Sequence, residues 1–262
     1  MNKNEYEMLE VLKELKNEYG VYEIKAEFEA EGSRMEELMR LKDVTSNAEL
    51  PIILKIGGVE AVADVYSALT IGVKGVIAPM AETPFAVKKF LNTIKIFVPE
   101  DNIQDIEFAI NIETDTAIRN LDQILDLPDL KLLSGVTVGR VDLLGSMGMD
   151  RSQVNGEEIR NKCQFVFERC RDKGLKSGLG GAISTDSIDF IKYMSKNALI
   201  DKFETRKVVF KNTEDSEFNY HKALMKSIEF ELMWLKSKQR YYSRIKYEDQ
   251  ARISMLEQRL LK

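Results

Sequence analysis

The chain of 262 residues contains one histidine, His221, and two cysteines, Cys163 and Cys170. A single histidine that lies in the predicted C-terminal helical region argues strongly against a Ser-His-Asp triad and a histidine-rich zinc site, so we expect His221 at the surface or in an interface. The two cysteines lie about two turns apart on one predicted helix, which is too far for a disulfide. We expect both to be small core residues.

Long apolar runs and an excess of basic charge are also missing. No stretch of about 18 apolar residues occurs, and the first 20 residues are acidic and helix-like rather than a signal peptide. We therefore expect a cytoplasmic protein with no membrane partner. The net charge of −5 argues against a general nucleic-acid-binding surface, although 38 lysines and arginines leave room for a local anion site.

A regular alternation of strand-like and helix-like segments runs along the chain. Alternation of this kind predicts parallel strands joined by right-handed crossovers. No glycine-rich dinucleotide-binding motif and no P-loop motif accompanies it, so the sequence gives no support for a nucleotide-binding site of either kind. Predicted strands cover residues 21–29, 51–57, 74–80, 106–113, 134–139, 175–181 and 203–210, and predicted helices cover 5–19, 33–43, 59–70, 84–94, 114–125, 156–172, 186–195 and 217–261.

This pattern predicts an α/β fold, specifically a (β/α)8 TIM barrel in which the first strand is irregular or missing, since seven strands are clear. A doubly wound open sheet is the alternative. We assign residues 1–215 to the catalytic barrel domain and residues 216–262 to a C-terminal helical extension. The extension exceeds what one barrel layer needs, so we expect it to lie in the interface of a homo-oligomer. Its predicted apolar stripe is Leu224, Ile228, Leu232 and Leu235.

Active sites of parallel barrels lie where the strands end, and polar side chains stand at several of these ends. Lys25, Glu27, Glu29 and Glu31 occupy every second position of the first strand and its continuation, so they share one face. That face belongs either to a solvated edge strand or to the barrel mouth.

Lys55 ends the second strand and precedes Gly57 and Gly58. Three interpretations are open: a clamp for a carboxylate or phosphate, a Schiff-base amine, or a side chain that extends to the surface. Glu82, after the third strand, fits a helix N-terminal charge.

Glu113 and Asp142 follow the fourth and fifth strands, with Asn111 and Gly139 just before them. The ends of neighbouring strands lie roughly 5 Å apart, and two carboxylates that close repel unless a cation lies between them. Taken alone, each carboxylate is more often a helix cap. Together they suit Mg²⁺ or Mn²⁺, which bind through one or two carboxylates plus substrate oxygens and water.

The segment N-I-E-T, followed about thirty residues later by G-R-V-D-L-L-G-S-M-G-M, resembles the HpcH/HpaI aldolase and citrate lyase β-subunit family, whose members are pyruvate-type TIM barrels. The segments F-E-A-E-G-S, P-I-I-L-K-I-G-G and G-V-K-G-V-I-A-P-M-A-E-T resemble further family motifs in the same order. The resemblance covers roughly residues 20 to 183.

The resemblance implies that Glu113 and Asp142 hold a divalent metal ion. The metal would chelate pyruvate or another 2-oxo acid and stabilise its enolate. Gly139, Arg140 and Val141 would form the substrate-binding stretch, in which backbone N–H groups of Val141 and Asp142 hold the carboxylate.

The resemblance also gives roles to three further residues. Lys55 stands where the family has an arginine that contacts the keto oxygen, and a lysine loses bidentate geometry. Asn111 stands where some members have a glutamine near the substrate. Glu29 stands at the acidic residue close to the metal-bound water, and with Lys55 it is a predicted catalytic residue.

Two departures from the family pattern concern proton transfer and charge. Family aldolases have a histidine base where this chain has Ala30, so Glu29, Glu31 or a metal-bound water would replace it. Arg140 stands where the family has proline, and Arg140 or Arg206 could bind a second acidic or phosphorylated group.

Three functions follow as alternatives. The first is a metal-dependent aldolase, a carbon–carbon lyase that uses pyruvate and an aldehyde. The second is a CoA-ester lyase of the citrate, citramalyl or malyl type. The third is a non-catalytic barrel that serves as a binding or assembly module. Family members are often trimers or hexamers with exchanged C-terminal helices, which agrees with the expected oligomer.

Overall fold

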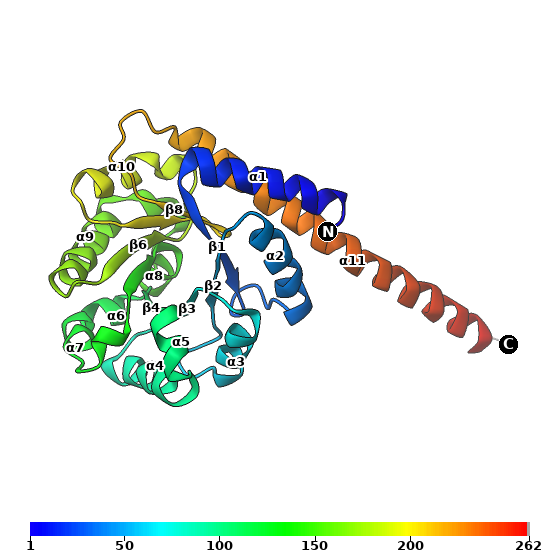
Figure 1. Ribbon diagram of the computed structural model, residues 1–262, viewed down its shortest axis with the longest axis horizontal. Helices are drawn as coiled ribbons and strands as arrows, with labels where there is room; N and C mark the ends of the chain where they lie inside the picture. The colour runs from blue at the N-terminus through cyan, green and yellow to red at the C-terminus, as the bar shows by residue number, and fades with distance from the viewer. Residues whose placement is uncertain (261–262) are drawn as a thin grey trace.

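The computed structural model describes residues 1–260, which form a closed barrel of eight strands surrounded by helices (Figure 1). The strands follow one another around the barrel in chain order. The closed barrel confirms the predicted fold and excludes the doubly wound open sheet. The strands are β1 Val21–Glu27, β2 Ile52–Lys55, β3 Gly75–Ala78, β4 Glu107–Ile112, β5 Gly135–Gly139, β6 Lys176–Gly180, β7 Lys202–Glu204 and β8 Val208–Lys211.

The last strand departs from the (β/α)8 pattern. A tight turn, in which the Thr205 N–H donates to the Val208 carbonyl at 2.9 Å, joins β7 to β8. β8 therefore runs antiparallel to both β7 and β1. Residues 203–210, predicted as one strand, form most of a hairpin that supplies the eighth strand. β1 is seven residues long and pairs in parallel with β2, so the first strand is present. Its pairing with β8 has a register shift between Val21 and Glu23.

Helices cover the outside of the barrel (Figure 1). Local signals fix their ends: the Thr83 hydroxyl accepts from the Ala86 N–H at the start of α4, and Pro84 is its first residue. The helices are α1 Lys3–Tyr19, α2 Met35–Asn47, α3 Val62–Ile71, α4 Pro84–Phe97, α5 Glu100–Asp105, α6 Asp115–Arg119, α7 Leu121–Leu125, α8 Arg140–Ser146, α9 Glu157–Asp172, α10 Ile188–Lys196 and α11 Tyr220–Leu260, with short 3-10 helices at Leu130–Leu132, Arg151–Asn155 and Thr185–Ser187.

The long helix α11 packs beside α1 and then extends away from the body (Figure 1). Its buried face differs from the predicted stripe. Leu224 is buried, but Ile228, Leu232 and Leu235 are 46%, 49% and 50% exposed. The large rings of Phe230 and Trp234 determine the helix rotation, because they bury more apolar area than the leucines would. The buried face is Tyr220, Ala223, Leu224, Ser227, Phe230, Trp234 and Ser237.

The cysteines, the histidine and the length of the helices can also be compared with the expectations from the sequence. Cys163 and Cys170 are buried and unpaired on α9, as small core residues would be, and His221 is exposed at the start of α11. Within residues 1–260, none of the helices combines the length and apolar character needed to span a bilayer.

Strand residues alternate between two surroundings. On β1, Ile24 and Ala26 belong to the main apolar core, whereas Glu23, Lys25 and Glu27 are buried along the barrel interior. Barrel interiors are usually filled by branched apolar side chains. In this barrel, a small apolar cluster lies beside these charged groups and leaves the mouth polar; its members are Ile53, Ile77, Ala109 and Val209.

Candidate active site

A cavity of about 410 Å³ opens at the carboxyl ends of the strands. It collects most of the residues that the sequence singles out, but Glu31, Glu82 and Arg140 do not line it. The predicted residues that line the cavity are Lys25, Glu27, Glu29, Lys55, Asn111, Glu113, Gly139, Val141, Asp142 and Arg206, together with Ala30.

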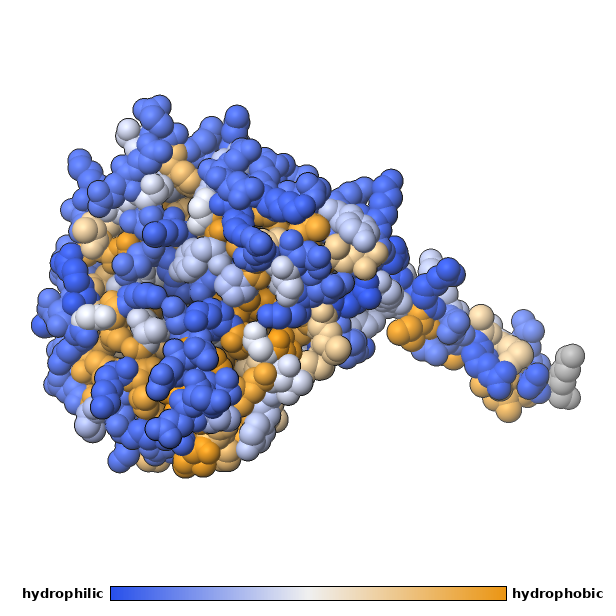
Figure 2. Space-filling view, in the orientation of Figure 1, coloured by the Kyte–Doolittle hydropathy of each residue, from blue (hydrophilic) through white to orange (hydrophobic). Residues whose placement is uncertain are grey.

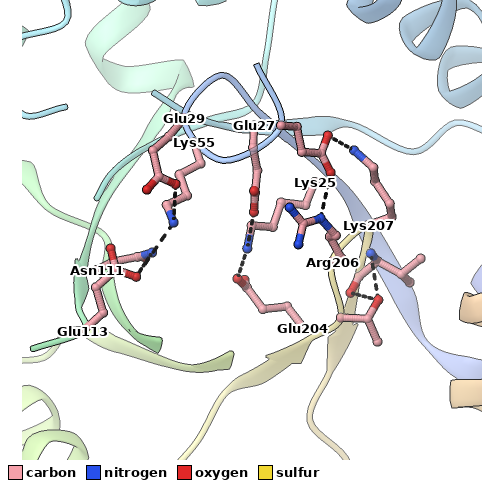
Figure 3. A network of polar contacts seen from close by, with 12 residues as sticks. Lys25, Glu27, Glu29, Lys55, Asn111, Glu113, Glu204, Arg206 and Lys207 are labelled. Atoms are coloured by element: carbon pink, nitrogen blue, oxygen red, sulfur yellow. Dashed lines mark hydrogen bonds and ion pairs between the residues drawn. The ribbon is translucent and has the colours of Figure 1, made fainter. Parts of the chain in front are cut away.

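The first strand sends its charged face into the barrel and not into solvent. The Lys25 Nζ lies 2.7 Å from Glu204 Oε1 and 3.1 Å from Glu27 Oε1 (Figure 3). Burial alone would lower the pKa of Lys25, but the carboxylates of Glu204 and Glu27 outweigh it and raise the pKa above its ordinary value. The edge-strand interpretation is therefore wrong, and Lys25 is a cation in the wall of the cavity.

Lys55 is buried at the end of β2 and does not extend to the surface. Its Nζ lies 2.8 Å from Glu29 Oε2 and 3.8 Å from Glu113 Oε2 (Figure 3). Burial opposes the charge of Lys55, but Glu113 and Glu29 raise its pKa above the ordinary value. A protonated amine is not a nucleophile, so this environment favours a charge-stabilising role over a Schiff base.

Glu113 is fixed just after β4 by two hydrogen bonds. The Met80 N–H donates to Oε1 at 2.9 Å and the Asn111 Nδ2 donates to Oε2 at 3.1 Å. Met80 has a left-handed φ of 50°, and strained backbone of this kind is frequent at functional sites. A Cβ at Gly139 would lie 2.5 Å from Glu113 Oε2, so glycine at this position leaves the space that the carboxylate occupies.

Burial raises the pKa of Glu113; Lys55 opposes this shift, whereas the charge of Asp142 adds to it. Asp142 lies in the first turn of α8, exposed to solvent. Within residues 1–260, its carboxylate has no hydrogen bond or ion pair. The two predicted carboxylates thus face one cavity, and one of them is not neutralised by protein cations.

The donor set fits a hard divalent cation. Glu113 and Asp142 offer carboxylate oxygens, and Asn111 Oδ1 is buried without a hydrogen-bond partner among the described residues. Residues 1–260 contain no cluster of three or more histidine, cysteine, aspartate or glutamate side chains that could hold a metal. A cation here would therefore take its remaining ligands from water or substrate, as Mg²⁺ commonly does.

Comparison with known proteins agrees with this geometry. The sequence profile of the HpcH/HpaI aldolase/citrate lyase family matches residues 35–184, more than half of the 262 residues. The chain belongs to this family. Its members are aldolases and lyases, so the family assignment indicates a carbon–carbon lyase. No curated protein sequence matches the chain.

Solved structures of the family share the fold. The HpcH/HpaI aldolase from Desulfitobacterium hafniense DCB-2 is 16% identical, with 76% of this chain and 80% of that chain covered and a TM-score of 0.60. The citrate synthase SbnG is 17% identical, with 74% and 89% covered and a TM-score of 0.58. A citrate lyase from Burkholderia xenovorans LB400 is 12% identical, with 76% and 68% covered and a TM-score of 0.58.

Arg140 does not serve this family member as a substrate clamp. Its side chain is fully buried, and the guanidinium donates to the carbonyls of Gly180 at 3.1 Å and Gly181 at 2.8 Å, and to Asn155 Oδ1 at 2.8 Å. It also stacks over Phe190 at 4.6 Å. Arg140 therefore ties loops together behind the cavity, which contradicts the expectation that its side chain binds an acidic group.

The backbone of the same segment begins α8. The first N–H groups of a helix have no partner within it, and those of Val141 and Asp142 lie at the start of α8. A Cβ at Gly181, whose φ is +78°, would lie 2.8 Å from the Val141 nitrogen. Glycine at 181 thus lets the backbone pass close to the amides of Arg140 and Val141.

Several cavity residues are not evident from the sequence. Thr137 Oγ1 and Glu204 Oε2 are buried without hydrogen-bond partners among the described residues, and both residues line the cavity. Arg151 and Glu231 line it as well. Thr137 could have been found from its alternation with Gly139 on β5, but Glu231 lies on α11, far from any strand end.

Proposed function

We propose that this family member is a divalent-metal-dependent aldolase that forms or cleaves a 2-oxo acid through the enolate of pyruvate, with an aldehyde as second substrate. The observation that carries the proposal is the carboxylate pair: Glu113 is buried with a raised pKa, and Asp142 is unpaired in the same cavity. Glu113 and Asp142 would hold Mg²⁺ or Mn²⁺, which when bound supplies a Lewis acid for the keto oxygen of the substrate.

Lys55 and the backbone of α8 would orient the 2-oxo acid. The Lys55 ammonium is held by Glu29 at 2.8 Å and would donate a hydrogen bond to the oxygen on which enolate charge develops. The N–H groups of Val141 and Asp142 would donate to the substrate carboxylate. Because Glu29 already pairs with Lys55, we propose it as a positioning residue.

The first test separates metal binding from chemistry. Mn²⁺ binding is followed by electron paramagnetic resonance, and exchange of the pyruvate methyl protons in D₂O is followed by NMR, for wild type and Asp142→Ala. We expect wild type to bind Mn²⁺ and to exchange the protons only with metal present. Asp142→Ala should lose both, with exchange falling by about 10²–10³-fold. Glu82→Gln, near the mouth but outside the cavity lining, serves as the control and should match wild type.

Other results would point to the alternative functions. Mn²⁺ binding without exchange would remove pyruvate as the nucleophile, and CoA esters would then be tested as substrates. Absence of both Mn²⁺ binding and exchange would contradict the metal site and favour a barrel that serves as a binding or assembly module.

A further inference from the structure

Formation of a pyruvate enolate needs a group that accepts a proton from the methyl carbon. The only histidine of the chain, His221, is exposed and does not line the cavity. Ala30, which does line it, has no titratable group. Apart from a water bound to the proposed metal, the candidate proton acceptors are the carboxyl groups that face the cavity.

Three of the six carboxylates that line the cavity are already engaged in ion pairs. Glu27 and Glu204 share the ammonium of Lys25 at 3.1 and 2.7 Å, and Glu29 lies 2.8 Å from the ammonium of Lys55. Proton uptake by any of them would break an ion pair that is buried or, for Glu29, partly buried, which is costly. These three groups are therefore poor proton acceptors.

Two of the remaining three, Glu113 and Asp142, are the proposed metal ligands. The third is Glu231, which is half-buried on α11. Within residues 1–260 its carboxylate forms no hydrogen bond and no ion pair. Glu231 is thus the cavity carboxyl group left free to gain and lose a proton.

The long helix carries Glu231 over the barrel mouth. Ile228, one turn earlier on α11, lines the same cavity. The charged groups that face Glu231 are Lys207 and Arg206 on the β7–β8 turn, and Glu31 and Glu27 on the β1 side. The last two lie on either side of Ala30 in the sequence, so Glu231 approaches the side of the cavity that Ala30 lines.

The electrostatic surroundings suit proton transfer. Burial raises the pKa of Glu231, while Lys207 and Arg206 oppose the shift and the carboxylates of Glu31 and Glu27 add to it. A carboxyl group with a raised pKa comes closer to the working pH, which is the condition for an effective general base.

We propose that Glu231 is the general base of the enolisation, so that α11 completes the active site in addition to packing on α1. The Glu231 carboxylate takes the proton from the pyruvate methyl carbon. The C–H electron pair becomes the C2–C3 double bond, and the carbonyl pair moves onto the keto oxygen. In the reverse direction the Glu231 carboxyl group returns the proton to that carbon. This inference rests on the proposed aldolase function.

The test is the pH profile of pyruvate methyl exchange in D₂O for Glu231→Gln and for the control Glu229→Gln. Glu229 is on the same helix, does not line the cavity and pairs with Lys226 at 2.9 Å. Glu231→Gln should lower exchange by about 100-fold and remove the acidic limb of the profile, on which the rate rises with pH. Mn²⁺ binding should stay unchanged. Glu231→Asp should restore part of the rate and keep the limb.

The outcomes separate this inference from the function on which it rests. If wild type shows no exchange, the pyruvate function fails and the role of Glu231 fails with it. If wild type exchanges and Glu231→Gln matches Glu229→Gln in rate and profile, only the role of Glu231 is overturned. If Glu231→Gln is unstable, the Glu231→Asp profile decides, because an unchanged rate and limb after shortening the side chain would also overturn it.

Discussion

Two groups of buried carboxylates lie along the same barrel and differ in how their charge is compensated. Burial would raise the pKa of Glu204, but Lys25 and Lys202 outweigh it and the pKa lies below its ordinary value. Burial also raises the pKa of Glu113, and there Lys55, at 3.8 Å, offsets the shift only in part.

This difference separates structural charge from functional charge. Glu204 has its cations within the protein, so it contributes a charge-compensated network in the wall of the cavity. Burial makes the charged form of Glu113 unfavourable, and the neighbouring charges do not offset this cost fully. Such groups are frequent at functional sites. A divalent cation shared with Asp142 would remove that cost.

Breaking the compensated network should have the largest effect on stability. Lys25→Met leaves Glu204 and Glu27 without their closest cation and should lower the free energy of unfolding by about 3–5 kcal/mol, measured by chemical denaturation. The double variant Lys25→Met/Glu204→Leu should recover much of this loss, because it removes the uncompensated charge as well. A single variant as stable as wild type would show that Lys25 is not what neutralises the network.

The site around Glu113, whose charge the protein offsets only in part, can be disturbed by a substitution at Gly139. Gly139→Ala places a Cβ 2.5 Å from Glu113 Oε2 and displaces that carboxylate. We expect Mn²⁺ affinity to fall by about 10–100-fold, the range seen when the support of a metal ligand is lost. Gly145→Ala, where a Cβ meets nothing within 4 Å, should bind Mn²⁺ as wild type does. Equal affinities in the two variants would argue against Glu113 as a ligand.

The two carboxylates could be predicted from the sequence because their placement follows from simple periodicity. Glu113 comes directly after one strand and Asp142 three residues after the next, and the carboxyl ends of parallel strands share one edge. Lys55 could be placed by the same rule, although its pairing with Glu29 depends on how residues 28–34 fold back, which no local pattern specifies.

Glu204 and Glu231 could not be placed in this way. The turn between β7 and β8 has no glycine, proline or asparagine, the usual hairpin signals, so residues 203–210 give the pattern of one strand. Glu231 faces the cavity because Phe230 and Trp234 set the rotation of α11, and that choice among several apolar faces is made by tertiary packing. Arg140 follows a strand end as Asp142 does, but its side chain turns to loop carbonyls.

Removal of the uncompensated charge should stabilise the metal-free protein. The folded-state pKa of Glu113 is raised, so its ionised form costs stability at neutral pH, and this cost disappears as pH falls through the folded pKa. Glu113→Gln should therefore increase the free energy of unfolding by about 1 kcal/mol at pH 7, and the gain should shrink in acid. Thermal unfolding without metal measures it. Glu204→Gln should have the opposite sign, because its folded pKa is lowered and its stabilisation is lost as pH falls.

The distal part of α11 should matter least to the barrel and most to assembly. Ile245, Ile253 and Leu256 are 55%, 47% and 42% exposed, and hydrophobic side chains are visible along the extending helix (Figure 2). We propose that they pack on a second copy of the chain. Truncation after Ser243 keeps Tyr242, which lies against Arg34.

At low protein concentration, where mass action no longer favours an oligomer, this truncation should change the free energy of unfolding by no more than about 0.5 kcal/mol. Light scattering coupled to size-exclusion chromatography should show a smaller assembly than the full chain. An unchanged molar mass would contradict the proposed interface. Because Glu231 remains in the truncated chain, retention of pyruvate exchange would further show that the helix completes the cavity with its first half and joins subunits with its second.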